Sequence, residues 1–171
     1  MNLVVFSGPP SSGKTSVILK TIDALKQQGI SVGVVKFDCL YTDDDILYEK
    51  AGIPVKKGLS GALCPDHFFV SNIEEVVQWG RSLGISMLIT ESAGLCNRCS
   101  PYIKDIKGIC VIDNLSGINT PKKIGPMLKS ADIVIITKGD IVSQAEREEF
   151  ASRVNSVNTT AVKMQVNGLT G

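Results

Sequence analysis

The sequence has few aromatic side chains, a single histidine and almost no excess of charge. Aromatic residues make up 5% of its 171 positions, His67 is its one histidine, and 18 Lys and Arg stand against 17 Asp and Glu. A net charge of +1 without a basic cluster lacks the electrostatic footprint of a nucleic-acid-binding protein, so we expect no nucleic-acid partner. No apolar run approaches the ~18–20 residues that cross a bilayer, so we expect no membrane partner either.

A secretory signal is also missing, because the short apolar run after Met1 has neither a basic flank nor a small-residue cleavage site. We therefore expect a cytoplasmic protein, in a compartment where disulfides are rare. Thiols there are available for metal binding or reactive chemistry, except Cys110, which lies in the apolar run 108–113 and is expected to pack in the core. The five cysteines are Cys39, Cys64, Cys96, Cys99 and Cys110.

Strand and helix patterns alternate along the chain, over a length that suits about one domain. Apolar runs of strand length occupy 3–7, 31–37, 86–90, 108–113, 132–137 and 161–166, and helical spacing occupies 14–29, 72–84 and 143–155. This alternation predicts an α/β fold with a mostly parallel central sheet flanked by helices. Between 39 and 72 the pattern weakens, which indicates a short helix over 42–52 and a switch or binding segment.

The first strand leads into a phosphate-binding motif. The run from Gly8 to Thr15 fits G-x-x-x-x-G-K-[ST], with a strand before it and a helix after it. Backbone N–H groups of such a loop point at phosphate oxygens, Lys14 reaches the outer phosphates and Thr15 binds Mg²⁺. We expect a nucleoside triphosphate to be bound here by Gly8, Ser11, Ser12, Gly13, Lys14, Thr15 and Ser16.

A second motif ends the run 132–137. Residues 137–140, Thr-Lys-Gly-Asp, resemble the signature by which GTPases select guanine, and the run 166–171 resembles the loop that contacts the base. The Asp140 carboxylate can accept hydrogen bonds from both the ring N–H and the exocyclic amine of guanine, so we expect Lys138 and Asp140 to bind the base. The alternative is a strand-ending turn with a solvated aspartate.

Two acidic residues follow predicted strands. Asp38 is placed to approach the γ-phosphate and Mg²⁺ or to orient an attacking water, and Glu91 ends a strand where P-loop enzymes place an acid linked to Mg²⁺ or water. The sequence therefore predicts Lys14, Asp38 and Glu91 as catalytic residues and Thr15 and Asp38 as Mg²⁺ ligands. Either acid is also compatible with a solvated loop position.

These motifs in this order resemble the nickel-handling GTPases of hydrogenase and urease maturation, the HypB/UreG group of SIMIBI-class P-loop NTPases. The resemblance spans nearly the whole chain and implies a GTP-dependent homodimer that delivers nickel to a client metalloenzyme, directly or through its maturation factors. It also implies a Cys–His metal pair, supplied here by Cys64 and His67, although Asp66 widens the spacing found in the urease type.

Cys96 and Cys99 form a Cys-x-x-Cys pair in a polar stretch that is expected to be a loop, which favours metal binding over thioredoxin-like redox chemistry or packing. Two such pairs across a dimer would hold Zn²⁺ or a [4Fe–4S] cluster. Alternatively, Cys64, His67, Cys96 and Cys99 form one site within a chain. An iron–sulfur-bridged dimer acting in electron transfer or enzyme activation is thus the second hypothesis, and a small-molecule kinase the third.

Two further expectations concern turnover and extent. Hydrolysis should be slow in isolation, because no arginine is placed as a finger. We expect 1–171 to form one nucleotide-binding G domain that is truncated at its C-terminal end, since a closing helix normally follows the last strand.

Overall fold

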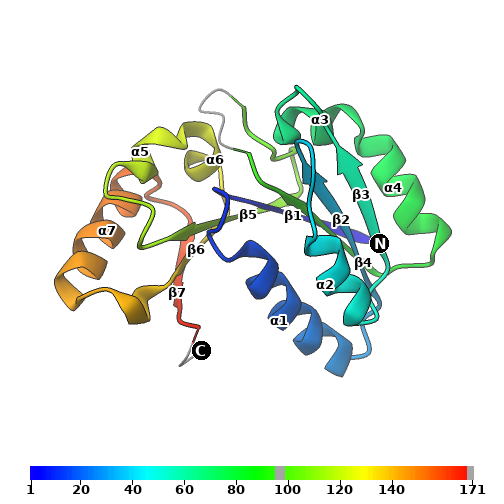
Figure 1. The fold of residues 1–171 in the computed structure, drawn as a ribbon, viewed down its shortest axis with the longest axis horizontal. Coiled ribbons are helices and arrows are strands. Elements are labelled where there is room, and N and C mark those ends of the chain that lie inside the picture. The colour runs from blue at the N-terminus through cyan, green and yellow to red at the C-terminus, as the bar shows by residue number, and fades with distance from the viewer. Residues whose placement is uncertain (95–98, 169–171) are drawn as a thin grey trace.

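The apolar runs of the sequence become strands that pair in parallel along one sheet (Figure 1). In the computed structural model, which describes residues 1–94 and 99–168, seven strands lie in the order β3-β2-β4-β1-β5-β6-β7. They are β1 (Asn2–Ser7), β2 (Val32–Asp38), β3 (Val55–Leu59), β4 (Met87–Ser92), β5 (Lys107–Asp113), β6 (Ile133–Thr137) and β7 (Val162–Val166).

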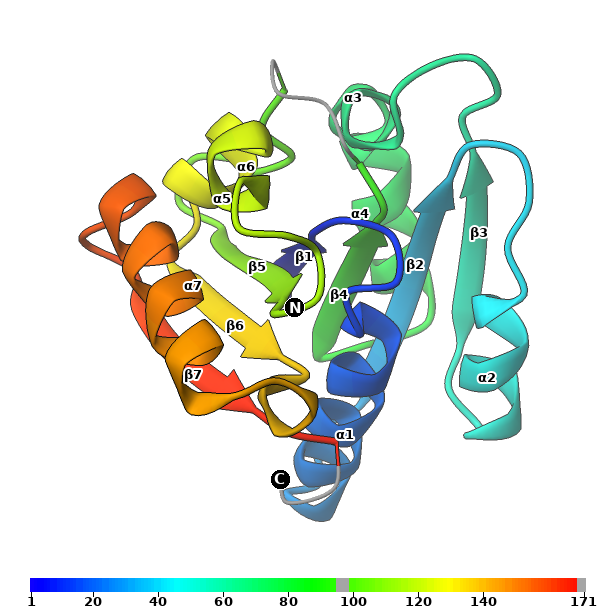
Figure 2. The same ribbon diagram turned by 60° about the vertical axis from the view of Figure 1, so that its left-hand side comes forward.

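Helices cover both faces of the sheet (Figures 1 and 2). They are α1 (Lys14–Gln27), α2 (Asp44–Lys50), α3 (Pro65–Ser71), α4 (Ile73–Ser82), α5 (Thr120–Lys123), α6 (Gly125–Lys129), α7 (Gln144–Val157) and the 3₁₀ turn η1 (Gly139–Ile141). None of those that the structure describes is both long and apolar enough to cross a bilayer.

Alternation of side chains along the strands divides the core between these two layers. On one face, Phe6 of β1 packs in a cluster with Ile18 and Ile22 of α1 and with Tyr48 of α2. The preceding residue, Val5, points to the opposite face, where α3 and α4 cover it. Farther along that face α5, α6 and α7 cover Cys110, Ile112, Val134 and Ile136. Cys110 is fully buried, which confirms it as a core residue.

The predicted α/β class and the six predicted strands are confirmed, but β3, α3, α5 and α6 were not predicted. β3 is an edge strand that pairs only with β2, so its Val-Lys-Lys-Gly-Leu sequence stays half exposed and lacks an apolar run. The helices α5 and α6 span four and five residues and contain Pro121 and Pro126 near their starts. Segments this short carry too few turns to show a helical period.

The strand order places a topological switch point at β1. The chain crosses from β1 to β2 on one side and later returns to β5 on the other, so β1 lies between β4 and β5. In open parallel sheets ligands bind at the carboxyl ends of the strands next to such a point. Ser7, Asp38, Ser92, Asp113 and Thr137 end their strands at this edge.

Candidate functional site

The loop between β1 and α1 has the backbone of a phosphate cradle. Gly8 has φ 153°, and a Cβ there would lie 2.0 Å from the carbonyl oxygen of Val111, so only glycine fits. Ser11 and Gly13 also have positive φ, 60° and 90°. The Ser12 hydroxyl is buried and, within the described residues, has no hydrogen-bond partner. A buried hydroxyl of this kind suits a phosphate oxygen.

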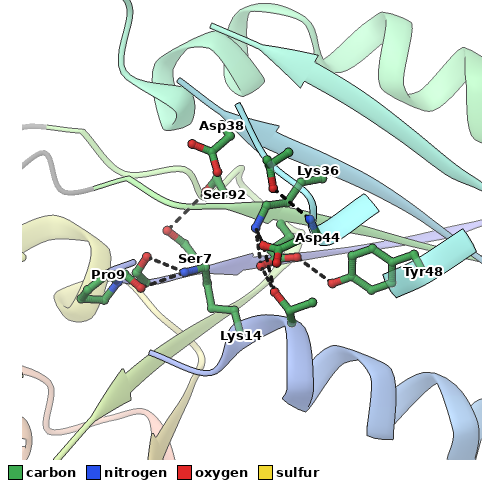
Figure 3. A network of polar contacts seen from close by, with 12 residues as sticks. Ser7, Pro9, Lys14, Lys36, Asp38, Asp44, Tyr48 and Ser92 are labelled. Atoms are coloured by element: carbon green, nitrogen blue, oxygen red, sulfur yellow. Dashed lines mark hydrogen bonds and ion pairs between the residues drawn. The ribbon is translucent and has the colours of Figure 1, made fainter. Parts of the chain in front are cut away.

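Lys14 fills the cradle with its own ammonium group. Its Nζ donates to the carbonyl oxygens of Gly8 (3.1 Å) and Pro9 (2.8 Å), and the side chain is 4% exposed (Figure 3). Burial lowers the pKa of Lys14 to about 8, although the nearby Glu91 carboxylate acts in the opposite direction. Lys14, which is predicted to bind phosphate, therefore lies at the loop and loses its proton more readily than an ordinary lysine.

Thr15 lies beside two carboxylates. Its hydroxyl oxygen is 2.9 Å from Glu91 Oε1 and 3.2 Å from Asp44 Oδ2. Lys36 donates to the same two oxygens, at 2.7 Å and 2.6 Å respectively. The other Glu91 oxygen, Oε2, accepts a hydrogen bond of 2.6 Å from the hydroxyl of Tyr48. Figure 3 shows this network between α1, α2, β2 and β4.

In this network the positive charge of Lys36 is paired with the carboxylates of Glu91 and Asp44, which offsets the cost of removing these groups from water. Glu91 is fully buried and Lys36 is 2% exposed. Burial alone would lower the pKa of Lys36, but Glu91 and Asp44 together raise it above its ordinary value. Burial and the Glu91 charge raise the pKa of Tyr48, so its hydroxyl remains a proton donor. Glu91 is therefore an acceptor fixed in place by three donors.

The oxygen atoms around Thr15 suit magnesium. A hydroxyl and two carboxylates are hard donors of the kind that Mg²⁺ takes beside a triphosphate. The Asp38 carboxylate, predicted as a ligand, accepts a hydrogen bond from the N–H of Cys39 (2.8 Å). Asp44, from the predicted switch segment, contacts Thr15. Neither Asp44, Lys36 nor Tyr48 was predicted as a site residue.

The end of β6 is docked directly on the phosphate loop. Thr137 donates through its hydroxyl to the Ser12 carbonyl (2.7 Å), and Lys138, at φ 58°, donates to the Ser11 carbonyl (2.6 Å). Next to them lies a cavity of about 410 Å³ whose lining includes Gly13, Ser16, Lys20, Lys138, Asn167 and Gly168. Thr137 and Lys138 of the predicted guanine motif thus border a cavity beside the cradle. Asp140 is half-buried and lies in η1, directly after Gly139.

The predicted metal-binding residues are only partly brought together. Cys64 immediately precedes α3 and His67 lies in its first turn. The Sγ atom of Cys99 is 4.0 Å from Nδ1 of His67. Cys96 lies outside the described residues. Within the described ranges, no group of three or more His, Cys, Asp or Glu side chains is placed to hold a metal ion.

A further thiol, Cys39, lies on the same side of the molecule. With Cys64, Asp38 and Pro10 it lines a mainly apolar cavity of about 440 Å³. This cavity connects the segment that precedes α3 with the phosphate loop. Cys39 was not predicted as a member of a particular site, because it stands alone in its stretch of sequence.

Asp66 links the Cys64–His67 segment to the nucleotide side of the sheet. Its Oδ1 accepts a hydrogen bond of 2.5 Å from Ser92, whose hydroxyl lies 3.4 Å from that of Ser7. Burial raises the pKa of Asp66 above its ordinary value, and no partner for its Oδ2 exists in the described part of the chain. From the sequence, Asp66 was expected only to widen the spacing between Cys64 and His67.

A parallel sheet with a phosphate loop after its first strand, a lysine and threonine at the start of the next helix, and a cavity beside them defines a P-loop nucleotide-binding domain. The chain belongs to the CobW/HypB/UreG family: the model of the CobW/HypB/UreG nucleotide-binding domain matches residues 2–165. The predicted resemblance to HypB/UreG-type SIMIBI P-loop NTPases is thereby confirmed.

Individual relatives agree with this assignment. An uncharacterized protein of Methanocaldococcus jannaschii is 56% identical over 171 residues, which are 100% of this chain and 73% of that protein. The urease accessory protein UreG 2 of a Bradyrhizobium species is 30% identical over 149 residues, covering 81% of this chain and 69% of its own. The crystal structure of Helicobacter pylori HypB in complex with nickel has a TM-score of 0.75 at 21% identity and covers 98% of this chain and 79% of that one. At this identity the structural likeness concerns the fold.

Proposed function

We propose that this protein binds and hydrolyses GTP with Mg²⁺ and uses the cycle to deliver nickel to a client metalloenzyme. The observation that carries the nucleotide part is the docking of the guanine motif on the phosphate loop through Thr137 and Lys138. That contact supports one site that includes both the phosphate cradle and the strand end predicted to bind the base. Membership in the CobW/HypB/UreG family supports the metal part.

Each side chain of the nucleotide site has a distinct role in this proposal. Lys14 leaves the carbonyls of its own loop and pairs with the outer phosphates, and Asp140 accepts from the guanine edge. Thr15 binds Mg²⁺, which neutralises phosphate charge as the γ-phosphoryl group is transferred to water. Glu91 holds the Mg²⁺ side of the site in place. Asp38, at the mouth of the switch segment, remains the candidate that orients the water.

The proposed cargo site is formed by Cys64, His67, Cys96 and Cys99. Thiolate and imidazole suit Ni²⁺ or Zn²⁺. The short distance from His67 Nδ1 to Cys99 Sγ supports one site within a chain that draws on both motifs. An imidazole beside Cys99 favours nickel or zinc over the all-thiolate ligand set that is usual for an iron–sulfur cluster. The nickel bound by Helicobacter pylori HypB is consistent with the same choice.

Nucleotide and nickel measurements on matched variants test the proposal. The wild-type protein should hydrolyse GTP in preference to ATP, and Asp140→Asn should remove most of that preference. Cys99→Ser and His67→Ala should each lower the nickel retained after equilibrium dialysis, while Cys39→Ser, which changes an exposed thiol outside the proposed site, should retain it. Equal turnover of GTP and ATP by the wild type would refute the guanine assignment. Full nickel retention by both His67→Ala and Cys99→Ser would refute the cargo site.

A further inference from the structure

We propose that Lys36 is a positioning residue of the nucleotide site, whose ammonium group occupies the place between Glu91 and Asp44 where a divalent cation would bind. In the absence of nucleotide it satisfies both carboxylates, so that Mg²⁺ is taken up only together with the triphosphate. This inference rests on the proposed nucleotide-binding function and adds a residue that the phosphate-loop motif does not contain.

The sheet register itself brings Lys36 and Glu91 together. They are direct neighbours in the parallel pairing of β2 with β4. Glu91 contacts Thr15 of α1 and Tyr48 of α2, and Lys36 contacts Asp44 of α2. The Lys36 ammonium lies 2.7 Å from Glu91 Oε1 and 2.6 Å from Asp44 Oδ2. These are the two oxygens that Thr15 contacts. The ammonium therefore shares its oxygen neighbours with the side chain expected to bind Mg²⁺.

The charges of the nucleotide-free site balance. Glu91 and Asp44 contribute two negative charges, and Lys36 and Lys14, which act electrostatically on one another and on both carboxylates, contribute two positive charges. A divalent cation entering this site meets no net attraction and must displace a buried ammonium from its partners. A triphosphate changes the balance, because it adds several negative charges and draws Lys14 to itself.

A purely structural ion pair would have a different signature. Lys36 also joins β2 to β4 and to α2, so replacing it should lower stability in either case. Only a cation that occupies a magnesium position leaves behind a site that Mg²⁺ itself can fill. The response of the nucleotide-free protein to Mg²⁺ therefore separates the two roles.

The experiment compares melting temperatures of nucleotide-free variants with and without MgCl₂. Lys36→Met should melt below the wild type and recover by about 3 °C or more when Mg²⁺ is about ten times its Kd. The wild type and Lys36→Arg, which keeps a cation, should show no Mg²⁺ shift. Lys36→Met combined with Asp44→Asn should lose the recovery. Lys57→Met removes another lysine paired to α2, through Asp45, and should not respond to Mg²⁺.

An unresponsive Lys36→Met protein, or a wild type that binds Mg²⁺ equally well without nucleotide, would overturn the proposal. Should Lys36→Met not fold, calorimetric titration of the nucleotide-free wild type and of Lys36→Gln with MgCl₂ decides the same point, with binding expected for Lys36→Gln alone. Because no nucleotide is present, failure here leaves the GTPase proposal standing. GTP binding is measured separately. If it failed, the Mg²⁺ result would still decide whether Lys36 occupies a cation position.

Discussion

Single residues of the nucleotide site are governed by charges that are buried and compensated at short range. Lys14, Lys36 and Glu91 are each at most 4% exposed, and each contacts an opposite charge or a carbonyl oxygen. In such surroundings the protonation state of one side chain affects its neighbours strongly. Changes in pH are therefore expected to alter both ligand affinity and folding stability.

The affinity for GTP should depend on the protonation of Lys14. Because the pKa of Lys14 in the free protein is lowered to about 8, the ammonium is largely present below that pH and is lost above it. A triphosphate binds the protonated form, so affinity should be nearly constant below pH 8 and fall by up to about tenfold per pH unit above it. Fluorescence titration with a GTP analogue across this range measures the slope. Lys14→Arg, which keeps its charge, should bind more weakly but without this slope.

Asp66 should make the protein less stable as pH rises. Its pKa is raised by burial in the folded state, so the folded protein holds this proton more tightly than the unfolded chain. The stability that protonation contributes is present at low pH and is lost as pH rises through the unfolded and then the folded pKa. Asp66→Asn, which keeps an acceptor for Ser92, should therefore gain stability relative to wild type as pH increases from acidic to neutral. Denaturant unfolding of both proteins across this pH range measures the difference. A difference in unfolding free energy between Asp66→Asn and wild type that stays constant with pH would contradict this prediction.

At the scale of elements, α2 fastens the part of the predicted switch segment that directly follows β2. Asp44 and Tyr48 lie about one turn apart on α2, and Asp44 contacts Lys36 while the fully buried Tyr48 contacts Glu91. The loop from Cys39 to Asp43 connects β2 to this anchor. A conformational change of α2 would have to break its contacts with Glu91 and Lys36.

Tyr48→Phe tests this anchor. Removal of the hydroxyl leaves Oε2 of the buried Glu91 without its donor, which should cost about 1–3 kcal/mol of unfolding free energy. Denaturant unfolding monitored by circular dichroism gives the value. Tyr41→Phe is the matched control, because Tyr41 is 72% exposed and its hydroxyl contacts the exposed side of Asp43, so no measurable change is expected. Equal losses in both variants would mean that Glu91 does not depend on α2.

Most elements could be predicted from local pattern, and the exceptions share a cause. The central strands β1, β2, β4, β5 and β6 contain the buried apolar runs, and the helices α1 and α4 bury one face with a helical period. α7 begins at Ser143 with a complete capping box, which is a local signal for the start of a helix. β3 lies at the sheet edge, and α3, α5 and α6 are short, so none of them shows a clear apolar period. Their positions depend on neighbours that are distant in sequence.

At the scale of the whole molecule, apolar side chains gather on loops around the nucleotide site. Leu40 is 77% and Tyr41 72% exposed in the loop after β2, and Leu63 is 61% exposed in the loop after β3. Leu115, at 54%, follows β5. All four lie in loops that follow strands, at the carboxyl edge of the parallel sheet. Exposed apolar side chains gathered on one side commonly mark an interaction surface.

We expect this edge to close a homodimer when GTP and Mg²⁺ are bound. Light scattering should give the monomer mass for nucleotide-free protein and about twice that mass with a non-hydrolysable GTP analogue and Mg²⁺. Leu63→Glu should keep the protein monomeric, because a charge would be buried in the interface, while leaving nucleotide affinity unchanged. Val162→Glu, an equally exposed apolar position on β7 away from this edge, is the control and should still dimerise. Dimerisation of Leu63→Glu would place the interface elsewhere.

The sequence alone determined the phosphate loop, the alternating α/β order and the core role of Cys110, because each depends on a contiguous stretch whose backbone or apolar pattern is local. Tertiary structure decided which acids meet Thr15, since Asp44 and Glu91 lie 29 and 76 residues away from it and are placed by strand register and loop path. It also decided the pairing of Lys36 with Glu91 across 55 residues and of His67 with Cys99 across 32. Side chains far apart in sequence are brought into contact here by strand register together with the positions of helices and loops on the sheet, and no local pattern encodes those positions.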